Sequence, residues 1–320
     1  MSSETVTNPP ATAHLSRRHG AAVLAVVCSA GVTVSLLQTA VIPVIPDLPR
    51  LLATTPAGAS WVLTSTLLAG AVAMPVSGRL GDLFGKRRLL GGCLLMLVLG
   101  SVCCAAADTL LPMLLGRILQ GLGMGAVPLG VSIMRDVLPA DRVAVGAGVI
   151  SATLGIGGAV ALPLGGVFVE HFGWHSVFWG AAGLGALCLL ALYAVVPESP
   201  QRHRAPVDLP GIAGLALGVG ALLLAVSQGG VWGWGSARVL GLAVGGTVVL
   251  ALWVWHELRR PDPLVDLRVS ATPVVRWVNF TGLLLGFGMY VLPLTFPLIL
   301  LAPPESGYGL GRSVTDVGLV

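Results

Sequence analysis

Two clusters of polar side chains interrupt a sequence that is otherwise strongly apolar. Arg117 and Gln120 lie within the apolar stretch 110–135, and Asp82 is followed closely by the three consecutive basic residues 86–88. A charged side chain inside an apolar helix is costly unless it faces a cavity or a polar partner, so such residues are functional candidates. Residues of these types can hold, exchange or steer charge.

The sequence shows no arrangement of residues that supports bond-breaking catalysis. Its six histidines lie in predicted loops, termini or helix ends, and His171 and His175 have metal-like spacing but no third ligand nearby. The five cysteines fall in apolar runs without a CxxC pattern, as expected of small core residues. The sequence therefore predicts neither an enzyme nor a bound cofactor or metal.

The elements that position these residues are predicted to be membrane-spanning helices. Hydrophobic residues make up 55% of the chain and charged residues only 10%, with a mean hydropathy of +0.90. A soluble domain needs about a quarter of its residues charged, so much of this surface should face lipid. Stretches of about twenty apolar residues occur near 20–46, 57–78, 88–107, 110–135, 143–169, 176–196, 210–228, 238–255 and 275–301. A tenth begins at about Val317 and is cut off by the chain end.

The distribution of basic residues predicts the orientation of these helices. With the N-terminus inside, fourteen of the eighteen Arg and Lys residues fall on the inner side and three on the outer side, while Arg117 is within a span. Positive residues are retained on the cytoplasmic side of membrane proteins. We therefore expect a cytoplasmic N-terminus.

The segment 78–88 carries a recognisable pattern, with glycines that permit a tight turn between two helices. It reads GRLGDLFGKRR and resembles the signature loop of the major facilitator superfamily, Gly-x-Leu-Ala/Gly-Asp-Arg-x-Gly-Arg/Lys-Arg/Lys, except that Leu83 replaces a basic residue. In that family the loop latches the two halves of the transporter on the cytoplasmic side. The resemblance implies a cytoplasmic gate formed by Gly78, Asp82, Gly85, Lys86, Arg87 and Arg88.

Arg117, Gln120, Gly121 and Met124 recur at helical spacing and should share one face of the fourth helix. The alternative for Arg117 is a side chain that extends to the outer headgroups. The pattern also resembles the superfamily motif Arg-x-x-Gln-Gly-x-Gly, in which the arginine is linked to proton transfer. The resemblance implies that Arg117, Gln120 and Gly121 belong to the proton-coupling region.

The fifth helix is rich in glycine and contains a proline, which allow bending and close packing. The run 155–166 resembles the antiporter motif Gly-Pro-x-x-Gly-Gly, although Ala161 and Leu162 stand where Gly-Pro is usual. The resemblance implies an antiporter-like helix with Gly158, Pro163, Gly165 and Gly166 as its functional positions. Without the resemblance, the same residues predict a packing face.

Further similarities to the bacterial fourteen-helix drug/proton antiporter branch of this superfamily lie at 208–211, 232–235, 263–268 and 307–310. That branch usually carries an Asp in the first helix, where this chain has Gln38 followed by Thr39. A glutamine can form hydrogen bonds but cannot carry a proton. We expect Gln38 and Thr39 to line a substrate cavity.

The resulting prediction is an all-α, polytopic helical membrane protein, apparently truncated at its C-terminus. Its expected parts are a disordered cytoplasmic N-terminus (1–19), an N-terminal six-helix bundle (20–196), a cytoplasmic linker (197–209), an inserted helix pair (210–255), a cytoplasmic loop (256–274) and the first helix of an incomplete C-terminal bundle (275–320).

The expected function is proton-coupled efflux of small amphipathic or cationic compounds by alternating access between two bundles. The alternatives are a metabolite facilitator or importer of the same fold, and a non-transporting sensor or fragment. We expect a monomer in the bacterial inner membrane that meets lipid, protons and a small-molecule substrate, uses the proton gradient without a cofactor, and binds no nucleic acid.

Overall fold

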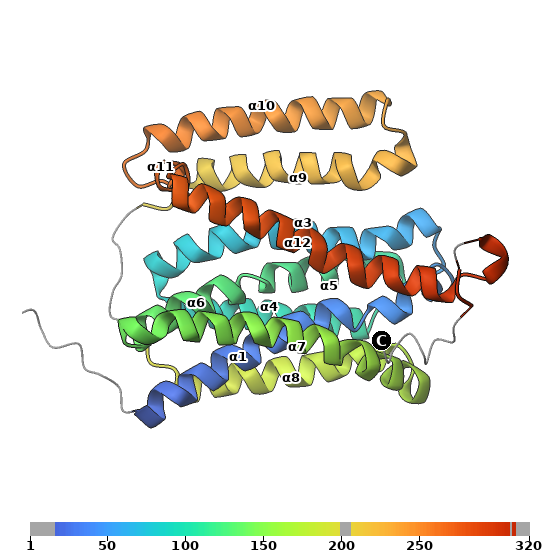
Figure 1. Ribbon diagram of the computed structural model, residues 1–320, viewed down its shortest axis with the longest axis horizontal. Helices are drawn as coiled ribbons and strands as arrows, with labels where there is room; N and C mark the ends of the chain where they lie inside the picture. Colours follow the sequence, from blue (N-terminus) through green and yellow to red (C-terminus); the bar gives the residue numbers. More distant parts are fainter. Residues whose placement is uncertain (1–16, 199–205, 308, 312–320) are drawn as a thin grey trace, which may run out of the picture. The chain divides into compact units, whose positions relative to one another are not determined.

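The protein is helical throughout the part of the chain that the computed structural model describes, residues 17–198, 206–307 and 309–311 (Figure 1). Within these ranges no strand occurs. A helix satisfies its backbone hydrogen bonds internally, and apolar segments in lipid require this. The predicted all-α class is confirmed.

Eight helical segments are long and apolar enough to cross a membrane. They are Gly20–Thr39, Pro56–Phe84, Lys86–Ala105, Leu110–Val137, Asp141–Phe172, His175–Val195, Leu209–Trp232 and Ala237–Arg259. These match the first eight predicted spans. The ninth, 275–301, falls within a further long helix, Pro273–Leu301, and the tenth lies outside the described residues. The chain is a multi-pass membrane protein.

The chain divides into two compact units, and the boundary in the sequence falls between Val207 and Asp208. The first contains α1 (Arg17–Thr39), η1 (Ile42–Asp47), α2 (Leu48–Leu51), α3 (Pro56–Phe84), α4 (Lys86–Ala105), α5 (Leu110–Gly123), α6 (Ala126–Val137), α7 (Ala140–Phe172) and α8 (His175–Val195). The second contains α9 (Leu209–Trp232), α10 (Ala237–Arg259), α11 (Leu267–Ser270), α12 (Pro273–Leu301) and η2 (Pro304–Ser306). Most of the predicted disordered N-terminus and of the 197–209 linker lies outside the described residues.

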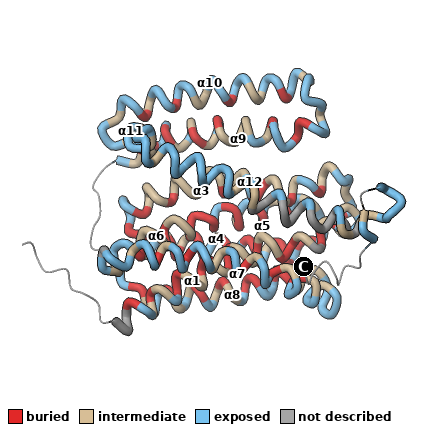
Figure 2. Tube along the Cα trace, viewed as in Figure 1, coloured by how far each residue is buried: buried red, intermediate tan, exposed pale blue. Residues whose placement is uncertain are grey.

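The core of the first unit forms where α4 packs against α5 and α8, and where α1 packs against α7 and α8. Leu90, Leu94 and Leu97 of α4 are almost fully buried, as are Val23 and Val27 of α1. Figure 2 shows buried and exposed positions alternating along these helices. Many of the exposed positions are Leu, Val or Phe. Such an apolar outer surface suits contact with lipid.

The predicted continuous helix at 110–135 is interrupted. Helix α5 ends at Gly123 and α6 begins at Ala126, because the glycines of this stretch stabilise a continuous helix poorly. The hydroxyl of Ser77 in α3 donates a hydrogen bond to the carbonyl of Gly125, 3.3 Å away. The absence of a side chain at Gly125 permits this contact, since a Cβ there would collide with Ser77. The break therefore brings α3 close to the α5–α6 junction.

In the second unit, α9 and α10 form an antiparallel hairpin. Gly218 of α9 lies against Leu250, and Gly246 of α10 lies against the carbonyl of Gly218. Small residues at such positions let membrane helices approach closely. The side chains of Asp208 and Ser236 cap the N-termini of α9 and α10. The hairpin thus has its own packing surface and its own helix caps.

Candidate functional site

Arg117 lies at the centre of a buried polar network that joins three helices of the first unit. Its Nε donates to the carbonyl of Val62 in α3, 3.0 Å away, and its Nη1 donates to Oε1 of Gln120 at 2.8 Å. The amide of Gln120 in turn donates to the hydroxyl of Ser101 in α4 at 3.0 Å. The hydroxyl of Ser101 donates a hydrogen bond to the carbonyl of Leu97. Arg117 and Gln120 thus share a polar face, as their spacing predicts.

Close helix contacts hold this network in place. A Cβ at Gly100 would lie 2.5 Å from the carbonyl of Gly116 and 2.8 Å from the amide nitrogen of Gln120. A Cβ at Gly121 would lie 2.5 Å from the carbonyl of Thr66. Only glycine allows backbones to approach in this way. Gly121, predicted as a coupling residue, acts here as the contact between α5 and α3.

Arg117 does not extend to the membrane surface. Only 1% of its area is exposed, and it donates hydrogen bonds to a backbone carbonyl and a side-chain amide. No described carboxylate forms an ion pair with Arg117. Burying an unpaired cation costs several kcal/mol by general estimate. A fold that retains such a residue without a stability benefit points to function. The alternative of a side chain that extends to the outer headgroups is not what the structure shows.

Gln38 lies at the contact between α1 and the α5–α6 junction. Its Nε2 lies 3.0 Å from Sδ of Met124, and it also has another polar interaction. Thr39 donates to the carbonyl of Ser35 in its own helix. Sulfur is a weak acceptor, so the contact with Met124 is weaker than the bond from Gln120 to Ser101. The role of Gln38 and Thr39 in lining a substrate cavity stays a prediction.

The turn between α3 and α4 is shorter than the sequence suggests. Helix α3 was expected to end near Gly78, with two glycines in a tight turn, but it continues through Phe84. Only Gly85, with φ of 103°, forms the turn. Gly78 and Gly81 are helical, and a side chain at Gly81 would collide with Leu129 of α6. Of these three glycines, Gly85 alone needs the conformational freedom of glycine.

Lys86, the first residue of α4, forms the main ion pair of this turn. Its Nζ lies 2.8 and 2.9 Å from the two carboxylate oxygens of Asp136, near the end of α6. Asp82 lies 4.0 Å from the same ammonium and its side chain is half exposed. Asp82 therefore presents part of its carboxylate outward, while Asp136 anchors the lysine.

Arg87 and Arg88 point to helix α8 and the segment that follows it. Arg87 donates to the carbonyl of Tyr193 and its guanidinium lies 5.1 Å from the centre of that ring. Arg88 forms an ion pair with Glu198 at 3.3 Å. The basic triplet thus ties α4 to both α6 and α8. Sequence reasoning missed Asp136, Tyr193 and Glu198, because nothing in their local pattern marks them as partners.

The antiporter-like positions divide between two environments. Gly158 lies near the hydroxyls of Ser35 and Thr39, and a Cβ at Gly165 would lie 2.8 Å from the carbonyl of Ala40. These two glycines form the contact between α7 and α1. A Cβ at Gly166 would meet no atom, and Pro163 lies within the continuous helix α7. Of the four positions, Gly165 therefore makes the contact that is too close for a side chain, while Gly158 lies at ordinary van der Waals distance from α1.

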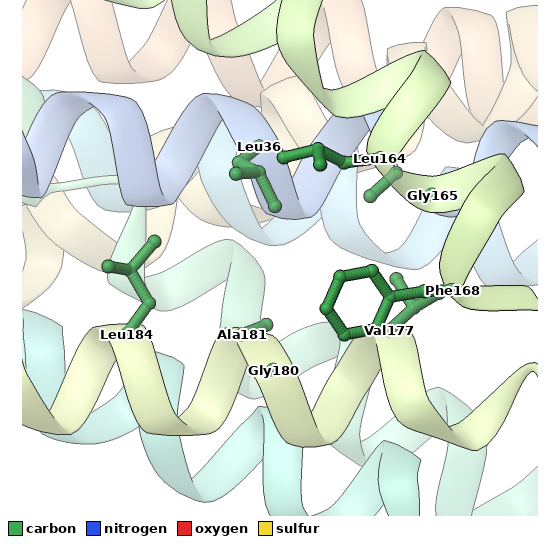
Figure 3. A pocket seen from close by; sticks show the side chains of 9 residues that line it. Leu36, Leu164, Gly165, Phe168, Val177, Gly180, Ala181 and Leu184 are labelled. Carbon is green, nitrogen blue, oxygen red and sulfur yellow. The ribbon is translucent and has the colours of Figure 1, made fainter. Parts of the chain in front are cut away.

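An apolar cavity of about 170 Å³ lies between α1, α7 and α8 (Figure 3). It is lined by Leu36, Ala40, Leu164, Gly165, Phe168, Val177, Gly180, Ala181 and Leu184. None of these side chains can form a hydrogen bond or carry a charge. The cavity is therefore suited to an apolar group and is separate in character from the Arg117 network.

Removing the ammonium of Lys86 is expected to destabilise the first unit. Lys86→Met removes both hydrogen bonds that the ammonium donates to Asp136, and we expect the free energy of unfolding to fall by about 1–3 kcal/mol, between the values for exposed and buried pairs. The matched control is Arg88→Met, whose side chain is 65% exposed and should cost less than about 1 kcal/mol. The stability of both variants is measured on heating, by the reaction of the buried thiols of Cys93 and Cys104 with a thiol-reactive fluorophore. Equal losses in the two variants would contradict the expectation.

The described residues form eight helices that are long and apolar enough to cross a membrane, which defines a polytopic membrane protein. The sequence profile of the Major Facilitator Superfamily matches residues 27–320. The chain belongs to that superfamily, as the α3–α4 segment predicts.

Relatives and solved structures agree with this assignment. The chain is 33% identical over 284 residues to the uncharacterized MFS-type transporter Rv1877 of Mycobacterium tuberculosis, covering 88% of this chain and 40% of that protein. It is 31% identical over 289 residues to the putative multidrug resistance protein MdtD of Salmonella typhi, covering 89% and 60%. The chain thus spans 40% to 60% of the length of these curated relatives.

Two solved transporters share the fold. The proton:xylose symporter XylE has a TM-score of 0.59 at 16% identity, covering 95% of this chain and 66% of that chain. The human organic anion transporter MFSD10 has a TM-score of 0.53 at 17% identity, covering 69% and 57%.

Proposed function

We propose that this chain belongs to a proton-coupled exporter of small amphipathic or cationic compounds. The observation that carries the proposal is the buried network of Arg117, Gln120 and Ser101, which holds a cation within an apolar span without a described carboxylate partner. Similarity to the putative multidrug resistance protein MdtD supports export. The energy source in this proposal is the proton gradient, and no bound cofactor is needed.

In this proposal the α3–α4 turn works at the cytoplasmic side of the bacterial inner membrane, with the N-terminus inside. Asp82 and the triplet beginning at Lys86 control access, and the glycine contacts of α7 with α1 allow the helices to slide or bend. The transporter acts as a monomer and exchanges protons for substrate. In this proposal the proton gradient supplies the direction, and alternating access couples the two movements.

A second candidate function is facilitated transport or import of a metabolite. It is favoured by Gln38, which lies against Met124 where an antiporter of the resembled branch carries an acid. A glutamine cannot exchange a proton. Accumulation in intact cells separates the candidates, because an importer raises the internal substrate level and an exporter lowers it.

The test of the leading proposal is substrate-driven proton movement. Inverted vesicles that contain the full-length protein are energised, and tetraphenylphosphonium is added as a lipophilic cation while a pH-sensitive dye reports the internal pH. We expect the cation to drive proton release, and Arg117→Ala to reduce that release to the level of empty vesicles. Absence of a proton signal, or a signal that Arg117→Ala leaves unchanged, argues against proton-coupled export.

A further inference from the structure

A cluster of four ionisable side chains closes one end of the α9–α10 hairpin. Asp208 precedes α9, and His256, Glu257 and Arg260 lie at the C-terminal end of α10. All four belong to the second unit, and the transport proposal uses none of them. Such a cluster in an otherwise apolar hairpin needs its own explanation.

Asp208 is the fixed anion of this cluster. Its side chain is only 4% exposed, and it accepts hydrogen bonds from the amide of Gly211 at 3.0 Å and from Nη2 of Arg260 at 3.0 Å. Burial disfavours the charged form, but the bonds from Gly211 and His256 and the charge of Arg260 outweigh it, so the pKa of Asp208 is lowered from its usual value. Asp208 therefore stays ionised at neutral pH.

Nε2 of His256 lies close to two groups with which it cannot form hydrogen bonds at the same time. Its Nε2 lies 3.2 Å from both carboxylate oxygens of Asp208, and Nε of Arg260 lies 3.4 Å from the same nitrogen. A ring nitrogen that carries a proton donates to Asp208, whereas one that carries a lone pair accepts from Arg260. The two bonds cannot form together, so the presence of a proton on Nε2 decides which one forms.

Glu257 adds a second buried acid to the cluster. It is 2% exposed, and its Oε2 accepts from the amides of Leu264 and Val265. Its other oxygen, Oε1, is buried and has no hydrogen-bond partner. A Cβ at Gly211 would lie within 2.6 Å of this Oε1 and also of Oδ2 of Asp208. The unpartnered oxygen of Glu257 and Oδ2 of Asp208 therefore both lie beside Gly211.

We propose that the end of the α9–α10 hairpin is a proton-binding site, with His256 as the acceptor and Asp208 as its counter-ion. With both acids ionised and Arg260 charged, the four side chains carry a net charge of −1 when the imidazole is neutral. Proton binding by His256 brings that charge to zero. His256 is 30% exposed, so water can deliver and remove the proton. Histidine is the side chain suited to this exchange near neutral pH.

The other charged groups nearby have contacts of their own. Arg259 lies over the ring of Trp255 at 4.1 Å, Asp262 has an interaction of its own, Asp266 caps α11, and Arg268 donates to the carbonyl of Leu258. The consequence of proton binding therefore falls on Arg260. When the neutral ring carries its hydrogen on Nδ1, the added proton binds Nε2, and Arg260 then loses its bond to His256 while it keeps its bond to Asp208.

The test is a pH titration of the histidine rings by NMR on the full chain in lipid nanodiscs, labelled with ¹³C and ¹⁵N in histidine. His256→Gln identifies the signal of His256. We expect Asp208→Asn to lower the midpoint of that signal by about 1 pH unit or more, a tenfold weaker proton affinity, because the counter-ion is lost. We expect Arg260→Gln to raise the midpoint, because a competing cation and donor is removed.

The matched control is Arg259→Gln, which removes the same charge one residue earlier but no contact with His256. It should shift the midpoint by less than about a third of the Arg260→Gln shift, since exposed charges are screened. If Asp208→Asn does not fold, the comparison of Arg260→Gln with Arg259→Gln decides. An unchanged midpoint in Arg260→Gln, or equal shifts in the two arginine variants, overturns the proposal. The measurement needs no substrate or gradient, so its result is independent of the export proposal.

Discussion

The double variant Arg117→Met with Gln120→Leu is expected to fold at least as stably as the wild-type chain and to lose transport completely. The two substitutions replace a buried cation and its amide partner by apolar side chains of similar size. Replacing buried ionic groups in this way is often neutral or stabilising by about 1–4 kcal/mol. Ser101 keeps a partner, because its hydroxyl still donates to the carbonyl of Leu97.

The single variant Arg117→Met separates stability from function. It leaves Oε1 of Gln120 buried without its donor, and an unsatisfied buried group costs about 1–3 kcal/mol. We therefore expect the double variant to be more stable than the single variant, measured by heat-induced exposure of the buried cysteines. Proton release on addition of tetraphenylphosphonium should be absent in both variants. A double variant that transports normally would show that the network serves only packing.

Gly100→Ala is expected to cause the largest loss of stability of any single methyl addition in α4. The added Cβ would lie 2.5 Å from the carbonyl of Gly116 and 2.8 Å from the amide of Gln120. Neither backbone atom can rotate away, so α4 and α5 must separate. Overpacking of this kind costs about 1–3 kcal/mol, and more where backbone must move. The same shift would move Gln120 away from Ser101 and so disturb the polar network.

The matched control is Gly92→Ala in the same helix. A Cβ at Gly92 would meet no atom within 4 Å, and alanine stabilises a helix interior by about 0.5–1 kcal/mol relative to glycine. Gly92→Ala should therefore leave the thermal midpoint unchanged or raise it, while Gly100→Ala lowers it by several degrees. Similar midpoints for the two variants would mean that the α4–α5 contact is looser than the structure shows.

The location of membrane-crossing helices was predictable because it depends on a local property. A run of about twenty apolar residues must form a helix in lipid, whichever neighbours it meets. The stretches near 57–78 and 88–107 needed only their composition. Their ends were harder to predict. Helix α3 continues through the polar residues up to Phe84 and turns only at Gly85, whose φ is positive.

The candidate site was predictable only in part. The shared face of Arg117 and Gln120 follows from helical spacing. Their partners Ser101 and Val62 come from other helices, and no local pattern encodes a contact between segments distant in sequence. The same holds for Asp136, whose contact with Lys86 joins α6 to α4.

The sequence by itself determined the membrane class, the superfamily and the residues able to carry charge, since these depend on composition and on short patterns. The tertiary structure decided which charges are satisfied and by what. It placed Lys86 on Asp136, buried Arg117 among neutral acceptors, and brought His256 to Asp208 across the hairpin. The physical reason is that the free energy of a buried charge depends on groups within a few ångströms, and helix packing alone decides which groups those are.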